Sequence, residues 1–126
     1  MQNNFDWSEG SLAEGLRCYQ AEQFFEAHEH WESIWLKLRE PEKSFLQSLI
    51  QISAAFHHLR RGNRRGAISL LTRALARLDR CPSGYCCLDL AVLREQARQW
   101  LSAIQEEREL HLPAAFPEFR IIDNQD

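Results

Sequence analysis

Apolar residues recur at helical spacing through most of the chain, and this pattern predicts five helices. The fourth helix shows it most clearly, because its apolar positions follow the i, i+3, i+4, i+7 spacing of a buried face: Ala67, Leu70, Leu71, Ala74, Leu75 and Leu78. No segment shows the persuasive alternation of apolar and polar residues that is typical of a half-buried strand. The predicted helices cover about residues 9–20, 24–38, 42–61, 64–78 and 90–104.

Residues with known preferences for helix ends set the predicted boundaries. Ser11 followed by Glu14 fits a capping box for the first helix, and Pro41 stops the second. Asn63, after a glycine, is the expected N-cap of the fourth helix, and Asp89 is that of the fifth. Between them, residues 81–85 are expected to form a loop.

The fold class that follows is an all-α, single-domain antiparallel bundle of about five helices with short connections. At 126 residues the chain has the size of one domain, here residues 1–126, with a core over 9–105 and an extended tail over 106–126. No apolar run approaches the roughly 18–20 residues needed to span a bilayer, and the first residues do not resemble a signal peptide. We therefore expect a cytoplasmic protein whose four cysteines are reduced thiols.

Charge is distributed unevenly along the chain, although the net charge is only −3. Residues 1–59 carry a net −5, residues 60–80 a net +6 from seven arginines and one aspartate, and residues 81–126 a net −4. A basic band of this kind can bind a polyanion, but a solvated basic helix face is the commoner outcome. Nucleic-acid binding is therefore disfavoured.

The second helix contains the main candidate for chemistry. His28 and Glu32 are four residues apart, so they project from one face of the helix, on the edge of its apolar side. A carboxylate beside tryptophan is costly unless it is paired, hydrogen-bonded or bound to a metal. Two interpretations stay open: a structural pair between helices, or a site in which both residues are catalytic or ligate a divalent ion.

A narrow polar stripe on the third helix suggests further site residues. Gln47, Gln51 and His58 fall within about 40° of one another on an otherwise apolar helix, beside small alanines. If this stripe faces the second helix, then His28, Glu32, Gln51 and His58 converge. The alternative is a solvated stripe on a partly exposed helix.

These motifs resemble a known family of small helical bacterial and archaeal proteins, the domain-of-unknown-function family numbered 309. The resemblance rests on His-x-x-x-Glu-x-x-Trp, met by His28, Glu32 and Trp35, then on residues 46–51 and on residues 58–67. Some members carry a metal-dependent hydrolase label that rests on this motif, so the resemblance implies metal binding and establishes no reaction. Residues 62–75 also resemble half of a tetratricopeptide-type hairpin, without the repeat of an array.

Two main functions follow as hypotheses, and enzyme status stays open between them. The first is a metal-dependent hydrolase with His28 and Glu32 as catalytic residues, zinc or manganese held by those two and His58, and substrate contacts from Trp35, Gln47 and Gln51. The second is a non-catalytic helical interaction module in which His28 and Glu32 form a structural pair. The expected partner is a small molecule, another protein or a second copy of the chain, and no membrane.

Overall fold

Five α-helices make up most of the protein, and the all-α prediction is confirmed. The computed structural model describes residues 5–106 and 112–122, and 65% of these residues are helical. None of the helices in this part of the chain has the length and hydropathy that crossing a bilayer requires. The helices are α1 (Gly10–Gln20), α2 (Phe24–Trp35), α3 (Glu42–Arg60), α4 (Arg64–Leu78) and α5 (Leu90–Gln105).

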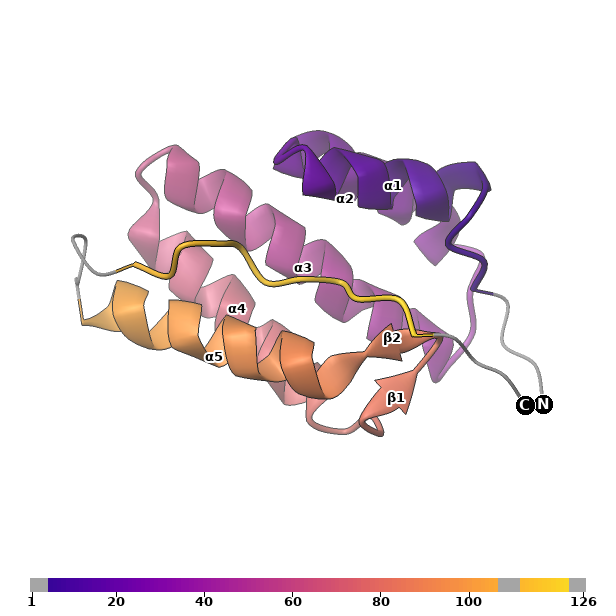
Figure 1. The fold of residues 1–126 in the computed structure, drawn as a ribbon. Coiled ribbons are helices and arrows are strands. Elements are labelled where there is room, and N and C mark those ends of the chain that lie inside the picture. The colour runs from indigo at the N-terminus through magenta and orange to yellow at the C-terminus, as the bar shows by residue number, and fades with distance from the viewer. Residues whose placement is uncertain (1–4, 107–111, 123–126) are drawn as a thin grey trace.

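The central helix of the bundle is α3, as its largely apolar sequence predicts. In Figure 1 the hairpin of α1 and α2 lies above α3, and α4 and α5 lie below it. Both α2 and α4 pack against α3, while α1 packs on α2 and α5 on α4. Because it has neighbours on both sides, α3 buries Phe45, Leu49, Ile52 and Phe56 completely or almost completely.

Residues 112–122, which we call the strap, run as an extended segment across the front of α3 between α1 and α5 (Figure 1). Phe116 of the strap stacks on Trp100, with ring centroids 4.9 Å apart. The hydroxyl of Tyr19 donates to the carbonyl of Pro117 at 2.7 Å, and the indole of Trp100 donates to that of Ala115 at 2.9 Å. The extended tail is thus observed over residues 112–122; residues 107–111 and 123–126 of the predicted tail lie outside the described residues.

The loop predicted over residues 81–85 is wrong in part, because it leads into a short β-hairpin. Strands β1 (Gly84–Tyr85) and β2 (Leu88–Asp89) pair antiparallel. The two residues between them, Cys86 and Cys87, have φ values of 51° and 65°. Two left-handed residues match the turn that a two-residue hairpin prefers, but the usual sequence for that turn is Asn-Gly or Asp-Gly. Two cysteines in these positions therefore carry no recognisable hairpin signal.

Two of the predicted helix caps are confirmed. The side chain of Asn63 accepts from the backbone N–H of Gly66 at 2.9 Å, and Asp89 accepts from that of Val92 at 3.2 Å. The capping box predicted at Ser11 is wrong, since α1 begins after Glu9 without a side-chain cap. In addition, α2 ends at Trp35 rather than near residue 38.

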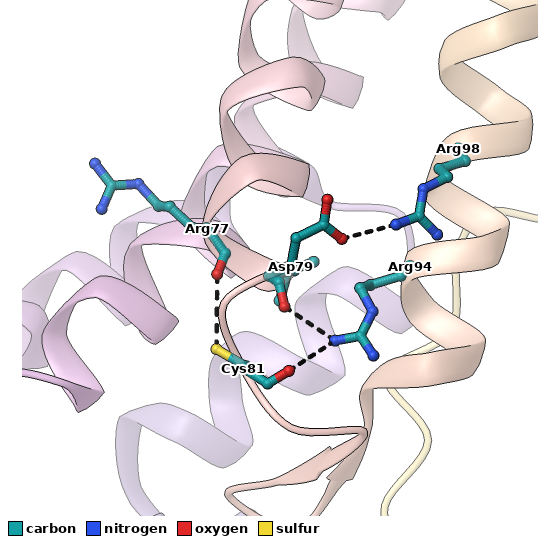
Figure 2. Close-up of polar contacts among 6 residues, drawn as sticks. Arg77, Asp79, Cys81, Arg94 and Arg98 are labelled. Atoms are coloured by element: carbon teal, nitrogen blue, oxygen red, sulfur yellow. Dashed lines mark hydrogen bonds and ion pairs between the residues drawn. The ribbon is translucent and has the colours of Figure 1, made fainter.

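Arginines of α5 hold the C-terminal end of α4 (Figure 2). Arg94 donates to the carbonyls of Leu78 at 2.9 Å and Cys81 at 3.2 Å, and Arg98 pairs with Asp79 at 2.7 Å. The last carbonyls of a helix lack partners within the helix and carry partial negative charge, so a guanidinium stabilises them. This connection fixes the orientation of α5 relative to α4.

We predict that Gly15→Ala destabilises the fold. A Cβ at Gly15 would overlap the indole of Trp31, which is fully buried and donates to the carbonyl of Leu12 at 3.2 Å. Overpacking costs about 1–3 kcal/mol, and displacing the indole adds the loss of its hydrogen bond, which together exceed the roughly 1 kcal/mol that alanine gains in a helix. Urea unfolding should show the loss, while Gln20→Ala on the exposed side of α1 should change stability by less than about 0.5 kcal/mol. Equal stability of the Gly15→Ala variant and the wild type would contradict this packing.

Candidate functional site

His28 and Glu32 lie one turn apart on α2 and contact each other, as their spacing predicts. Nε2 of His28 is 3.4 Å from a carboxylate oxygen of Glu32. The His28 side chain is 23% exposed and that of Glu32 is 55% exposed, so the pair lies at the rim of the helix interface. The carboxylate is therefore largely solvated, and the imidazole connects it to the buried side of α2.

The second nitrogen of His28 points into the protein. Its Nδ1 is buried and has no hydrogen-bond partner among the described residues. The ring of Phe25 lies beside the imidazole, with centroids 5.7 Å apart. A buried nitrogen near an aromatic ring is screened from solvent, which limits its use as a general base toward a molecule in solution.

The polar residues of the α3 stripe do not lie in one site. Gln51 is 5% exposed, and its Oε1 has no partner among the described residues, whereas Gln47 is half-buried and lines a surface cleft. Nδ1 of His58 is 3.1 Å from the amide nitrogen of Asn63, in the turn before α4. The stripe thus runs from a surface cleft through a buried amide to the far end of the helix.

The antiparallel course of α2 and α3 places His58 at a different level from Glu32, the second member of the pair. The indole of Trp35 donates to the carbonyl of Lys43 near the start of α3, and the ring of Phe25 lies 5.2 Å from that of His57 near its end. Since a helix rises 1.5 Å per residue, His58 lies at the Phe25 end of this contact, well past the level of Glu32.

The residues present do not form a three-ligand metal centre. A catalytic zinc usually takes three protein ligands, and His28 and Glu32 supply two. In the described ranges, no three His, Cys, Asp or Glu side chains lie together in a way that could hold a metal ion. The structure does not bring His58 to this pair, so the arrangement does not fit the metal that the family resemblance implies.

Two of the predicted substrate residues do meet, in a cleft of about 320 Å³ between the end of α2, α3 and α4. We call it the Trp35 cleft; it is lined by Trp35, Glu40, Lys43, Ser44, Gln47 and Arg77. Gln51 is not part of this lining. The sequence pattern placed Trp35 and Gln47 in a site but did not indicate Lys43, Ser44 or Arg77, because no spacing rule relates a residue of α4 to the start of α3.

A larger cleft, of about 560 Å³, lies between the end of α1 and the strap. Tyr19, Gln20 and Glu22 line one side, and strap residues from Ala114 to Ile121 line the other. None of the residues predicted from the sequence as catalytic, substrate-binding or metal-binding lies in it.

Two cysteines near the β-hairpin, Cys81 and Cys86, have the character of structural thiols. Burial raises the pKa of Cys81, and it raises that of Cys86 to about 12, so both are protonated at neutral pH. A thiol that stays protonated is a poor nucleophile and a poor metal ligand.

The basic band is partly engaged within the chain. Arg60 pairs with Glu22 and lies over the ring of Phe24, with 4.9 Å between the guanidinium carbon and the ring centroid. Nε of Arg64 donates to the carbonyl of Ile104 at 3.2 Å. These contacts fit a structural use of the first part of the band, and the expectation that nucleic acid is not a partner stays a prediction.

The geometry defines a small helical domain with a His–Glu pair on an outer helix and a separate polar cleft beside it. Residues 12–70 match the model of the domain of unknown function DUF309, which confirms the family resemblance indicated by the motifs. The matched range extends from α1 into the first half of α4 and includes His28, Glu32, Trp35, Gln47 and Gln51. Among curated proteins, none matches the chain.

We predict that His57, beside Phe25, titrates below the usual histidine pKa of about 6.5. Burial lowers the pKa of His57, and the positive charge of Arg61 lowers it further. The folded state therefore favours neutral His57, so its contribution to stability is present above the unfolded pKa and is lost as pH falls through the lower folded pKa. An NMR titration of the ring protons should give a midpoint below about 6.5, and Arg61→Gln should move it upward. A wild-type midpoint at or above the usual value would contradict the burial of this ring.

Proposed function

We propose that the chain is a non-catalytic helical interaction module in which His28 and Glu32 form a structural pair. The observation that carries the proposal is the placement of the two imidazole nitrogens. Nε2 faces Glu32 at 3.4 Å, and Nδ1 is buried, so neither is free to act on a molecule in solution. The role of the pair is then structural, with the imidazole packed beside Phe25 at the rim of α2 and its buried nitrogen turned inward.

The docking surface that we propose is the α2 face, made of Phe25, Glu29 and Glu32 of α2 and of Leu36, the residue that directly follows the helix. These residues are spaced by four, three and four positions, so they share one side of the helix. Phe25 is 44% exposed and Leu36 is 72% exposed, at opposite ends of the face. Exposed large apolar side chains that flank charged residues are typical of a protein contact surface.

The negative charge of the α2 face indicates which kind of partner would bind there. Glu29 is exposed and makes no ion pair among the described residues, and the carboxylate of Glu32 is more than half exposed. An amphipathic helix with lysine or arginine between two apolar residues would match this face in both polarity and spacing. We therefore propose a basic helical segment of another protein as the occupant of the α2 face.

A metal-dependent hydrolase is the second candidate; its predicted metal ligands do not converge, but one observation favours a bound ligand beside His28. Nδ1 of His28 and Oε1 of Gln51, on two helices that pack together, are both buried without a partner in the described part of the chain. Buried polar atoms without partners are uncommon and call for an explanation, such as a bound water or ligand. In this hypothesis the two side chains would bind or orient a ligand through those atoms.

We also propose that the protein works in the cytoplasm. The four cysteines are free thiols in the structure, including the three near the β-hairpin. Unpaired cysteines at this frequency suit a reducing compartment.

We predict that His28→Ala lowers the free energy of unfolding by about 1–2 kcal/mol, because the imidazole packs on Phe25 and anchors Glu32. Glu29→Ala, an exposed change on the same helix, should cost less than about 0.5 kcal/mol. Zinc or manganese added to the wild type should leave the Tm unchanged, since a ligand that binds the native state would raise it. A metal-dependent rise in Tm that disappears in His28→Ala would favour the hydrolase hypothesis instead.

We predict that a labelled synthetic helix, with leucine on one face and lysine beside it, binds the wild type in a fluorescence anisotropy titration. Glu29→Lys should weaken this binding about tenfold, because it places like charges opposite each other. Glu95→Lys, on an exposed part of α5, should leave it unchanged. A matched helix with glutamate in place of lysine should not bind. Equal binding of the lysine and glutamate helices would contradict the proposal, and so would an equal loss of binding in Glu29→Lys and Glu95→Lys. It would also be contradicted if sedimentation showed that the α2 face binds a second copy of the chain.

A further inference from the structure

The Trp35 cleft gathers side chains with unused hydrogen-bond donors from separate parts of the chain. Lys43 and Gln47 come from the first two turns of α3, and Arg77 comes from the last turn of α4. Figure 2 shows the Arg77 side chain extending away from the Arg94 and Asp79 contacts, so its guanidinium is not used there. Among the described residues, none of these three side chains makes a hydrogen bond or an ion pair with another protein group.

One carboxylate, that of Glu40, lies in the cleft, and it already accepts a hydrogen bond from Ser44. Glu40 accepts from the backbone N–H of Ser44 at 3.0 Å. The pKa of Glu40 is lowered, first by hydrogen bonds from the side chain and backbone of Ser44 and then by the nearby charges of Arg77 and Lys43. Glu40 therefore stays ionised, and because the lining holds two cations and one anion, its net charge is positive. The donors left for a ligand are those of Lys43, Gln47 and Arg77.

Trp35 forms a fixed wall of the cleft. Its indole N–H donates to the carbonyl of Lys43 at 3.0 Å, which sets the orientation of the ring. The ammonium of Lys43 lies 4.5 Å from the ring centroid, within the range of a cation–π contact. The lysine is thus positioned over the indole without a carboxylate partner, and the remaining part of the ring can contact an apolar group.

We propose that the Trp35 cleft binds a phosphate group, either as inorganic phosphate or as the phosphate of a small monoester. Arginine binds phosphate oxygens through two parallel N–H groups, and lysine adds a point charge, while the amide of Gln47 supplies a neutral donor. A volume of about 320 Å³ is at the small end of ligand sites, which fits a phosphate with a small organic group. This site does not depend on the docking of a partner at the α2 face.

Isothermal titration of the full chain in about 0.15 M salt, where surface charges are well screened, tests the proposal. Inorganic phosphate and phenyl phosphate are the probes, and acetate is the comparison anion. Both phosphates should give saturable binding. Tighter binding of phenyl phosphate would identify a monoester as the ligand, and equal or weaker binding would identify inorganic phosphate. Arg77→Gln and Lys43→Gln should each weaken binding about tenfold, whereas Arg73→Gln, an exposed arginine one turn earlier on α4, should not.

Three results would overturn the proposal. The first is the absence of saturable phosphate binding in a wild type whose thermal melt shows that it is folded. The second is an equal loss in Arg77→Gln and Arg73→Gln, which would indicate only diffuse positive charge. The third is acetate binding as tight as that of phosphate. NMR supplies a second readout that does not depend on the variants, since phosphate should shift the Trp35 indole N–H more than those of the buried Trp7, Trp31 and Trp100.

Discussion

The indole of Trp31 occupies the space that any side chain at position 15 would fill, and the arrangement of the N-terminal half depends on this contact. Because Gly15 has no Cβ, α1 approaches α2 closely enough for the indole to donate to the carbonyl of Leu12. The ring of Trp31 also contacts Tyr19 and the strap residue Phe119. With this face of α2 fixed inward, the imidazole of His28, in the preceding turn, falls at the rim, and the carboxylate of Glu32 is largely in solvent. The exposed position of the pair is thus a consequence of the core.

The same geometry explains why the polar residues of α2 and α3 separate into distinct regions. Trp35 is held at the start of α3, and Phe25 lies near the end of α3. Polar residues along the stripe are therefore at different depths and different levels. Gln47 reaches a surface cleft, Gln51 is enclosed, and His58 turns toward the next connection. A single convergent site would require these side chains to lie at one level.

Much of the fold could be predicted from the sequence, because helical periodicity and two strong caps, Asn63 and Asp89, are local signals. The β-hairpin could not be predicted, since its turn uses two cysteines in a conformation that usually selects asparagine or glycine. The contact between His28 and Glu32 follows from spacing on one helix. Arg77 was missed because its place in the Trp35 cleft depends on how α4 packs on α3, which is tertiary information that no local pattern contains.

The strap joins parts of the molecule that are far apart in the sequence. It contacts α1 through Tyr19 and α5 through Trp100, and Ile122 donates to the carbonyl of Cys87 beside β2. It lies wholly outside residues 12–70, the range that matches the family model. A fragment limited to that range would lack Phe116 and Phe119 and would leave their aromatic partners facing water. Residues 12–70 therefore do not complete the hydrophobic core by themselves, and its closing segment comes from outside the range that defines the family match.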